Sequence, residues 1–225
     1  MPTAPRRKPQ SVGRPVKRRA DNTRDRLLDA ALTLFAEKGY VATGTQEIID
    51  SAGVTKPVLY HYFESKEALF RELVGGIYDA TAAAWDSMLT EETKAIDRLR
   101  GILRISFEGS ARDPRLPRLL LQTHYGPPIA ELRAFMEGHT ARRFGSVVNI
   151  MRGGLESAEL RGGDASSLAL LFCCLMDQHI NALTRLPNGP ALLTPDRADA
   201  ILDAFLHGCG TTRRGPVSLP PLPLG

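Results

Sequence analysis

The chain has 225 residues, of which 43% are apolar and 24% are charged, and its formal net charge is +4 at pH 7. These values are ordinary for a soluble globular protein with one large or two small domains. The three cysteines, two of them adjacent, exclude a disulfide framework. No apolar stretch follows the basic N-terminus, and the longest apolar run, Leu168 to Met176, is too short to cross a bilayer. We therefore expect a cytoplasmic protein with no membrane partner.

Positive charge is concentrated at the N-terminus. Residues 1–26 contain nine Lys or Arg and two Asp, a local charge of +7, so the remaining residues carry −3. A basic arm on a mildly acidic body is typical of nucleic-acid-binding proteins, and it is equally typical of a solvated tail that aids solubility. Residues 1–20 are rich in Pro and Arg and lack apolar periodicity, so we expect them to be disordered.

Helical patterns begin at residue 21. Apolar residues recur at helical spacing from Leu27 to Phe35, and Gly39 is placed to end this first helix. The sequence TGTQ at residues 43–46 predicts a capping box, in which the first Thr and the Gln satisfy exposed backbone N–H groups of a short second helix. Gly53 is placed to end that helix.

A third and a fourth helix follow after a tight turn. Thr55 is expected to cap the third helix, with Pro57 in its first turn, where a missing N–H is harmless. Ser65 is expected to cap a long fourth helix that continues to about residue 80. Two short helices joined by the turn SAGVT at residues 51–55 predict a helix-turn-helix motif.

The rest of the chain is also expected to be helical, because it shows no strand alternation of useful length. Helix breaks are predicted near Asp113-Pro114, at residues 126–128, at residues 161–163 and between Pro187 and Pro195. Residues 211–225 are rich in Pro and are expected to form an extended or disordered tail.

The third predicted helix has an outward side that suits DNA better than water. At 100° per residue Leu59 and Phe63 point inward, whereas Tyr60, His61 and their neighbours point outward. Lys can donate to guanine in the major groove, Pro or Val can contact a thymine methyl, and Tyr or His can donate to phosphates. The predicted contacts are Thr55, Lys56, Pro57, Val58, Tyr60 and His61, and for Tyr62 core packing and DNA contact are left as equal alternatives.

Lysines stand in the first turns of two successive predicted helices, where negative side chains are normally favoured. Free N–H groups at a helix start bind anions, and a nearby Lys strengthens such a site. We therefore interpret Lys66 as a phosphate clamp beside the Ser65 cap. By the same reasoning Thr43 and Thr45 are candidates for contacts with the sugar-phosphate backbone of DNA. The alternative for both is helix capping alone, and it is favoured more for Thr43 than for Thr45.

This region closely resembles the DNA-binding domain of TetR-family transcriptional regulators. The resemblance covers residues 22–80 and rests on FAEKGY at residues 35–40, AGVTK at 52–56, LYHYF at 59–63 and SKEAL at 65–69. It departs at Ile49, where relatives usually have Ala. The resemblance implies that Lys56, Pro57, Tyr60, His61 and Lys66 contact operator DNA.

The resemblance also implies the architecture of the whole chain. We expect an all-α fold with an N-terminal three-helix helix-turn-helix domain at residues 21–80. A helical domain at residues 81–210 would bind a small-molecule effector and form a homodimer through the last two helices. A two-fold dimer would place two recognition helices about 34–36 Å apart on a palindromic operator in double-stranded DNA.

The basic arm contains a weaker signal of the same kind. Residues 13–15 form the Gly-Arg-Pro core of AT-hook minor-groove binders, without the Arg that usually precedes it. A narrow minor groove at A·T pairs attracts Arg. We expect Arg14 to enter the minor groove, and a loose, non-specific tether is the alternative.

Candidate effector contacts in the second half mix aromatic, sulfur-containing and a few polar side chains, which suits a mostly apolar ligand. Ordinary core packing is the alternative for each of them. The candidates are Phe107, Leu120, His124, Tyr125, Phe135, Met136, Phe144, Val147, Met151, Cys173, Met176 and Gln178.

Enzymatic motifs are missing from the sequence: it has no G-x-S-x-G, no phosphate-binding loop and no H-E-x-x-H. The five His lack metal-site spacing, so neither a metal nor a cofactor is expected. Cys173 and Cys174 are either a thiol sensor or a buried apolar pair. The main prediction is a repressor released from DNA by an effector, and the alternatives are an architectural DNA-binding protein without an effector and a helical enzyme with a vestigial DNA domain.

Overall fold

The computed structural model describes residues 16–87, 93–126 and 128–207, with side chains described from residue 22 onward. Within these ranges all regular structure is helical, which confirms the all-α class. The elements in chain order are α1 (Val16–Lys38), α2 (Thr45–Ala52), α3 (Lys56–Tyr62), α4 (Lys66–Asp86), α5 (Ala95–Arg112), α6 (Arg115–Tyr125), η1 (Ala130–Leu132), α7 (Arg133–Glu156), α8 (Ala165–Arg185), η2 (Gly189–Leu192) and α9 (Pro195–His207).

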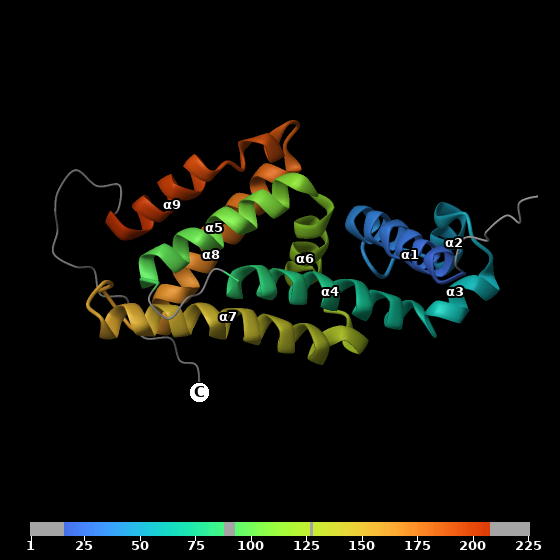
Figure 1. Ribbon diagram of the computed structural model, residues 1–225, viewed down its shortest axis with the longest axis horizontal. Coiled ribbons are helices and arrows are strands. Elements are labelled where there is room, and N and C mark those ends of the chain that lie inside the picture. Colours follow the sequence, from blue (N-terminus) through green and yellow to red (C-terminus); the bar gives the residue numbers. More distant parts are fainter. Residues whose placement is uncertain (1–15, 88–92, 127, 208–225) are drawn as a thin grey trace, which may run out of the picture.

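The helices form two groups joined by one long helix (Figure 1). Helices α1, α2 and α3 lie together at one end, and α5, α8 and α9 lie at the other. Helix α4 runs between the groups, roughly alongside the long α7, and α6 lies close to α1. The helix-turn-helix unit is therefore one end of an elongated molecule.

Most helix boundaries agree with the sequence patterns. The predicted breaks near residue 113, at residues 126–128 and at residues 161–163 are confirmed by the ends of α5, α6 and α7. Helix α1 starts at Val16, earlier than the predicted start at residue 21, because no Pro or Gly interrupts the chain between Val16 and Lys38. The arm up to residue 15 and the tail from residue 211 lie outside the described residues.

Two hydrophobic cores stabilise the fold. The first contains Leu27, Phe35, Ile48, Leu59 and Phe70 at 2% exposure or less, together with buried residues of α6, η1 and α7. The second is built from α5, α7, α8 and α9 and has large buried side chains in each of them. Because α6, η1 and α7 supply part of the first core, the N-terminal helices do not pack in isolation.

Helix α4 belongs to both cores. Leu69, Phe70 and Val74 are buried in the first core, and Trp85 near the other end of the helix is buried in the second. The predicted domain boundary at residue 80 falls inside this continuous helix. A change at one end of α4 is therefore transmitted along a rigid element rather than through a flexible linker.

The turn between α1 and α2 is held by internal hydrogen bonds. The Thr43 hydroxyl, 1% exposed, donates to the Gly39 carbonyl at 2.8 Å and lies 3.3 Å from the Leu34 carbonyl. The predicted capping box is wrong by one residue: Gly44 occupies the cap position, and its N–H donates to the Glu47 carboxylate at 3.0 Å. Thr43 faces inward because its hydroxyl completes the end of α1.

Two cationic side chains hold the helix-turn-helix unit together. The Lys66 ammonium donates to the Tyr40 and Thr43 carbonyls at 3.0 Å each and lies 4.4 Å from the Tyr40 ring centroid. The Arg26 guanidinium donates to the carbonyls of Ala52 and Gly53 at the end of α2. Both contacts join segments that are far apart in sequence, so they stabilise the relative positions of α1, α2 and α4.

Helix α8 is long and apolar enough to cross a membrane by length and composition alone. Half of its most apolar window is buried against other helices, chiefly those of the second core. A buried helix of a water-soluble core passes the same test, so α8 gives only weak evidence for a membrane span.

Replacing Thr43 with Val should lower the free energy of unfolding by about 1–3 kcal/mol, because the Gly39 carbonyl loses a buried donor. Urea unfolding followed by circular dichroism measures this change. Thr45→Val, at the half-buried first position of α2, is the matched control and should change stability by less than about 0.5 kcal/mol. Equal effects of the two substitutions would contradict the role assigned to Thr43.

Candidate nucleic-acid interface and ligand pocket

Helix α3 presents a polar and aromatic surface to solvent. Its inward side is anchored by Leu59, which is fully buried, while Lys56, Pro57, Tyr60 and His61 are exposed. Tyr60 is 44% exposed to solvent. The helix is short because Phe63, in extended conformation, ends it before Ser65 begins α4, where the Ser65 hydroxyl accepts from the Ala68 N–H at 3.0 Å. An exposed cation, two ring-bearing donors and a proline on one short helix suit the major groove of DNA.

The structure separates the other predicted DNA contacts into three groups. Thr55 is exposed at the start of α3, where its side chain makes no capping hydrogen bond. Thr45, Val58 and Tyr62 are half-buried, and the Tyr62 ring packs against the first core and edge-on to His61 at 5.1 Å between centroids. Arg14 lies outside the described residues.

The structure corrects two of the predicted contacts with the DNA backbone. Thr43 is buried and its hydroxyl is used within the domain, so its side chain does not reach the surface. Lys66 is half-buried and points at two carbonyls and the Tyr40 ring instead of standing free as a phosphate clamp. The sequence places both residues near a helix start. Whether each side chain faces DNA or the interior of the domain depends on the fold of the α1–α2 turn, because both side chains bond to carbonyls there.

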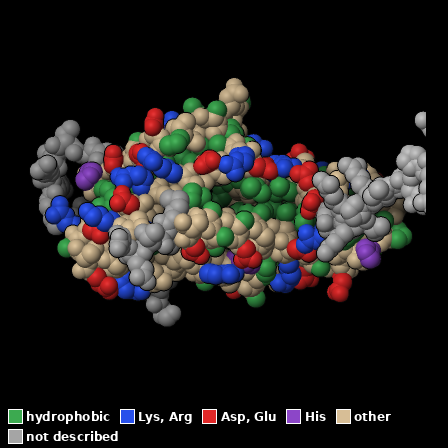
Figure 2. Space-filling model, in the orientation of Figure 1, with side chains coloured by type: hydrophobic (Ala, Val, Ile, Leu, Met, Phe, Trp, Pro, Cys, Tyr) green, Lys and Arg blue, Asp and Glu red, His purple; other side chains and the backbone are tan. Residues whose placement is uncertain are grey.

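A cavity of about 820 Å³ lies between the two groups of helices. Figure 2 shows a hollow with hydrophobic side chains gathered in it, in the middle of the visible face. Its walls are formed by α4, α5 and α6, with contributions from α1, α7 and α8. Apolar lining residues include Leu73, Ile77, Ile105, Leu116 and Leu120. The volume and lining are typical of a site for a small, mostly apolar molecule.

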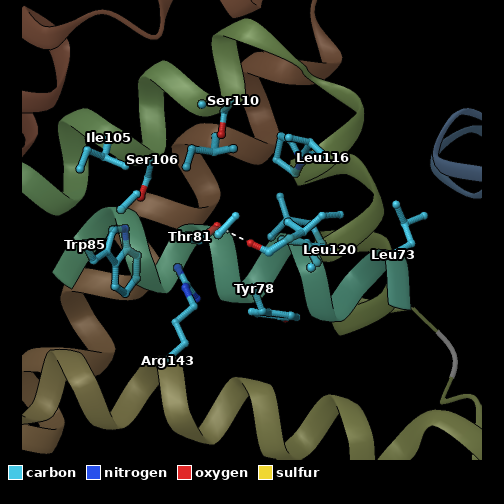
Figure 3. Close-up of a pocket in the computed structure, with 18 of the residues that line it drawn as sticks. Leu73, Tyr78, Thr81, Trp85, Ile105, Ser106, Ser110, Leu116, Leu120 and Arg143 are labelled. Atoms are coloured by element: carbon cyan, nitrogen blue, oxygen red, sulfur yellow. Dashed lines mark hydrogen bonds between the residues drawn. The ribbon is translucent and has the colours of Figure 1, made fainter. Parts of the chain in front are cut away.

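The inner part of the cavity carries a charged pair and an aromatic ring. Arg143 of α7 makes two hydrogen bonds to the Asp177 carboxylate of α8, at 2.6 and 3.1 Å. In Figure 3 the Arg143 side chain rises from α7 toward α4, where its guanidinium carbon lies 5.7 Å from the Trp85 ring centroid. Trp85 is 5% exposed, and its indole nitrogen has no hydrogen-bond partner among the described residues.

A second set of polar groups connects three helices at the cavity wall. The hydroxyls of Tyr78 and Thr140 are hydrogen bonded, and the Thr140 hydroxyl lies 3.4 Å from the His124 Nδ1 atom. Burial raises the pKa of the Tyr78 hydroxyl, which keeps this group neutral at physiological pH. The Tyr78 ring stacks on His139 with centroids 4.8 Å apart. These contacts link α4, α6 and α7.

Of the twelve residues predicted to bind an effector, Leu120 and His124 line the cavity. The others pack in the two cores or lie on the surface. The second core contains Phe107, Val147, Met151, Cys173 and Met176, and Phe144 packs against it. The first core contains Met136, and Phe135 packs against it, whereas Tyr125 and Gln178 are exposed.

Sequence reasoning missed the residues that α4 contributes. Tyr78, Thr81 and Trp85 recur at helical spacing and all line the cavity. That spacing, on a helix expected to leave the DNA-binding domain, was the signal available in the sequence. Asp177, directly after the apolar run Leu168 to Met176, was a second signal, because a buried carboxylate requires a cationic partner.

The adjacent cysteines differ in environment. Cys173 is buried, and burial raises the pKa of its thiol to about 11, so the thiolate is scarce at neutral pH. Cys174 is exposed on the other side of α8. The alternative of a buried pair is therefore wrong for Cys174, and Cys173 lacks the thiolate character that a sensor requires.

The exposed side of α8 is apolar. Leu170 and Leu171 are 41% and 40% exposed and lie beside Cys174 at helical spacing. These residues form a small apolar patch on the surface of α8.

Comparisons with known proteins agree with the helix-turn-helix geometry. The family described as "Bacterial regulatory proteins, tetR family" matches residues 27–73. The HTH-type transcriptional repressor KstR2 of Mycolicibacterium smegmatis is 35% identical over 100 residues, 44% of this chain and 46% of the relative. The HTH-type transcriptional activator FasR of the same species is 35% identical over 105 residues, 47% of this chain and 48% of the relative. The matches thus span less than half the length of these relatives.

Solved structures share the fold over most of the chain. The TetR-family regulator PfmR from Thermus thermophilus superimposes with a TM-score of 0.70 and 26% identity, covering 85% of this chain and 98% of PfmR. AibR, solved with isovaleryl coenzyme A and operator DNA, superimposes with a TM-score of 0.68 at 20% identity, covering 82% of this chain and 98% of AibR. The second likeness shows the fold alone.

Replacing Arg143 with Met should lower the free energy of unfolding by about 2–4 kcal/mol, because the Asp177 side chain, 14% exposed, loses its counter-charge. The double variant Arg143→Met with Asp177→Leu should recover most of this loss, since no unpaired charge remains. Urea denaturation measures both values. A double variant as unstable as the single one would show that packing, and not charge pairing, sets the cost.

Proposed function

We propose that this chain is a DNA-binding repressor of the TetR type that is released from its operator by a small molecule. The observation that carries this proposal is the exposed surface of α3 just before α4, together with a ligand-sized cavity lined by α4 from Glu72 to Trp85. As a regulator of this family it is not an enzyme, and we place it in the cytoplasm with its DNA.

DNA recognition is assigned to α3. Lys56 is proposed to donate to a base edge or a phosphate, Pro57 to contact a thymine methyl, and Tyr60 and His61 to position the helix on phosphates. Thr45, Thr55, Val58 and the edge of Tyr62 border this surface. Arg14 is proposed to enter the adjacent minor groove.

The functional unit is proposed to be a homodimer. The apolar side of α8 around Leu170 and Leu171, together with α9, would meet the same surface of a second copy. A two-fold dimer places two α3 helices about one DNA turn apart, which calls for a palindromic operator.

Effector control is proposed to act through helix positions around the cavity. Arg24 and Leu28 of α1 line the cavity together with residues of α4 and α6, so a bound molecule would contact the DNA-binding domain directly. Arg115 at the start of α6 also ties that helix to α1, at 2.9 Å from the Asp29 carboxylate. A ligand that favours one arrangement of α1, α4 and α6 would change the spacing of the two α3 helices and so the operator affinity.

Selection of bound DNA from a random pool, followed by footprinting, tests the regulator proposal. A discrete palindrome with protection of two half-sites is expected. Diffuse protection of A·T-rich DNA would instead support an architectural protein. A reporter gene placed behind the selected site distinguishes repression from activation.

Replacing Lys56 with Ala should weaken binding to the selected site by roughly tenfold or more and relax base preference, because a base or phosphate contact of about 1–3 kcal/mol is lost in each half-site. Fluorescence anisotropy with labelled duplexes measures the affinity. Lys94→Ala, an exposed lysine before α5, is the matched control and should leave affinity unchanged. Loss of affinity in the control alone would argue against α3 as the reading helix.

Replacing Leu171 with Glu should convert a dimer into a monomer, because two carboxylates would face each other across an apolar interface. Sedimentation velocity measures the oligomeric state. Val41→Glu, at a residue 78% exposed in the N-terminal domain, is the control and should remain dimeric. A dimeric Leu171→Glu variant would exclude this face of α8 as the interface.

A further inference from the structure

The cavity is long. Its wall on α4 runs from Glu72 to Trp85, a stretch of about 20 Å at 1.5 Å per helical residue. At one end Arg24 of α1 pairs with Glu72. At the other end Arg143, which pairs with Asp177 of α8, lies over the ring of Trp85. All five residues line the cavity, so it extends along α4 from the DNA-binding domain to α8.

The cavity is also narrow. Its volume of about 820 Å³, spread over this length, gives a mean cross-section of about 40 Å², or about 7 Å across. A compact molecule that filled the whole volume would be wider than this cross-section. A molecule that uses most of the available wall therefore has to be extended along α4.

Two glycines keep the cross-section open. Gly76 of α4 and Gly109 of α5 line the cavity, and a Cβ added at either position would meet no atom within 4 Å. A Gly inside a helix destabilises that helix relative to Ala. Ala80 and Ala84 continue the row of small side chains along α4 at helical spacing. At these positions the walls leave space beside the helices instead of filling it.

Much of the larger lining is aliphatic. Leu73 and Ile77 of α4 lie at the end near α1, and Leu116 and Leu120 of α6 lie across from α4 (Figure 3). The hollow opens on the face seen in Figure 2, so a molecule can enter from the side and not only through one end. Each methylene that leaves water for such a wall adds to the binding affinity.

We infer that this cavity binds a long, unbranched aliphatic chain that lies extended along α4 between Glu72 and Trp85. The inference rests on the proposed function, because it names the class of molecule that occupies the proposed effector site. An extended chain contacts the aliphatic wall over its whole length, whereas a compact molecule contacts only part of it. Chain length is then the property of the ligand that sets its affinity.

Straight-chain primary alcohols test this inference on the full-length protein, because they share one neutral head group and differ only in length. Affinity should rise from 1-hexanol through 1-octanol and 1-decanol to 1-dodecanol, by about two- to fourfold for each added methylene. 1-Adamantanemethanol has the same number of carbon atoms as 1-undecanol and the same hydroxyl group. Because it is compact, it should bind at least about tenfold more weakly than 1-undecanol. Titration calorimetry measures the affinities, and the fluorescence of Trp85, the single Trp of the chain, reports occupation of the cavity.

Gly76→Leu fills the cavity near its α1 end. Because the hollow opens on its side, this change shortens the cavity without closing the entrance (Figure 2). It should weaken 1-dodecanol binding by about tenfold or more, whereas 1-hexanol, which needs only part of the length, should keep its affinity within about twofold. Gly138→Leu in α7 is the matched control. Gly138 is another helical Gly with open space beside it, but it lies outside the cavity, so both affinities should stay unchanged.

The alcohol series on the unmodified protein decides the inference even if a variant fails to fold. Binding of 1-adamantanemethanol as tight as that of 1-undecanol, no gain beyond 1-octanol, or binding of none of the alcohols would overturn it. In folded Gly76→Leu protein, equal effects on 1-hexanol and 1-dodecanol would overturn it as well. Operator binding is measured separately on the same proteins, so failure of the inference remains distinguishable from failure of the regulator proposal.

Discussion

The structure depends on the continuity of α4. Its first turns are buried among α1, α2 and α3 through Leu69 and Phe70, and its last turns are buried among α5, α7 and α8 through Trp85. A helix packed at both ends cannot move at one end alone without disturbing the packing at the other. The same helix carries Tyr78 and Thr81 on the cavity wall. One rigid element therefore connects the proposed DNA-reading surface with the cavity, and a ligand needs only a modest preference for one helix arrangement to alter the other end.

Charge serves different purposes at different places on this protein. Lys56 and Lys66 occupy equivalent positions at the starts of successive helices, yet Lys56 is exposed and Lys66 donates to two carbonyls of the α1–α2 turn. The first is available to a phosphate or a base, and the second stabilises the scaffold that holds α3. At the cavity, Arg143 is matched by Asp177, so this pair presents no unmatched charge there.

Much of the DNA-binding end was predictable from local patterns. Helical periodicity correctly placed Leu59 and Phe63 inside and Tyr60 and His61 outside, because the side of a short amphipathic helix follows from residue spacing alone. The start of α2 was less predictable. Gly44 and not Thr43 occupies the cap position, because the Thr43 hydroxyl finds carbonyl partners at the end of α1. Local capping rules consider one helix start at a time, so they do not include competition from the carbonyls of a neighbouring helix.

The sequence by itself determined the all-α class, the helix-turn-helix unit and the family resemblance, because these are written in residue spacing, caps and helix breaks. Only the tertiary structure decided which residues surround the cavity. Six helices contribute to its wall, so a residue such as Met176 can be apolar and suitably placed in sequence yet face the core. The pairing of Arg143 with Asp177 and the unpartnered nitrogen of Trp85 likewise arise from contacts between distant segments. Such contacts are set by packing across the whole fold, which no local pattern records.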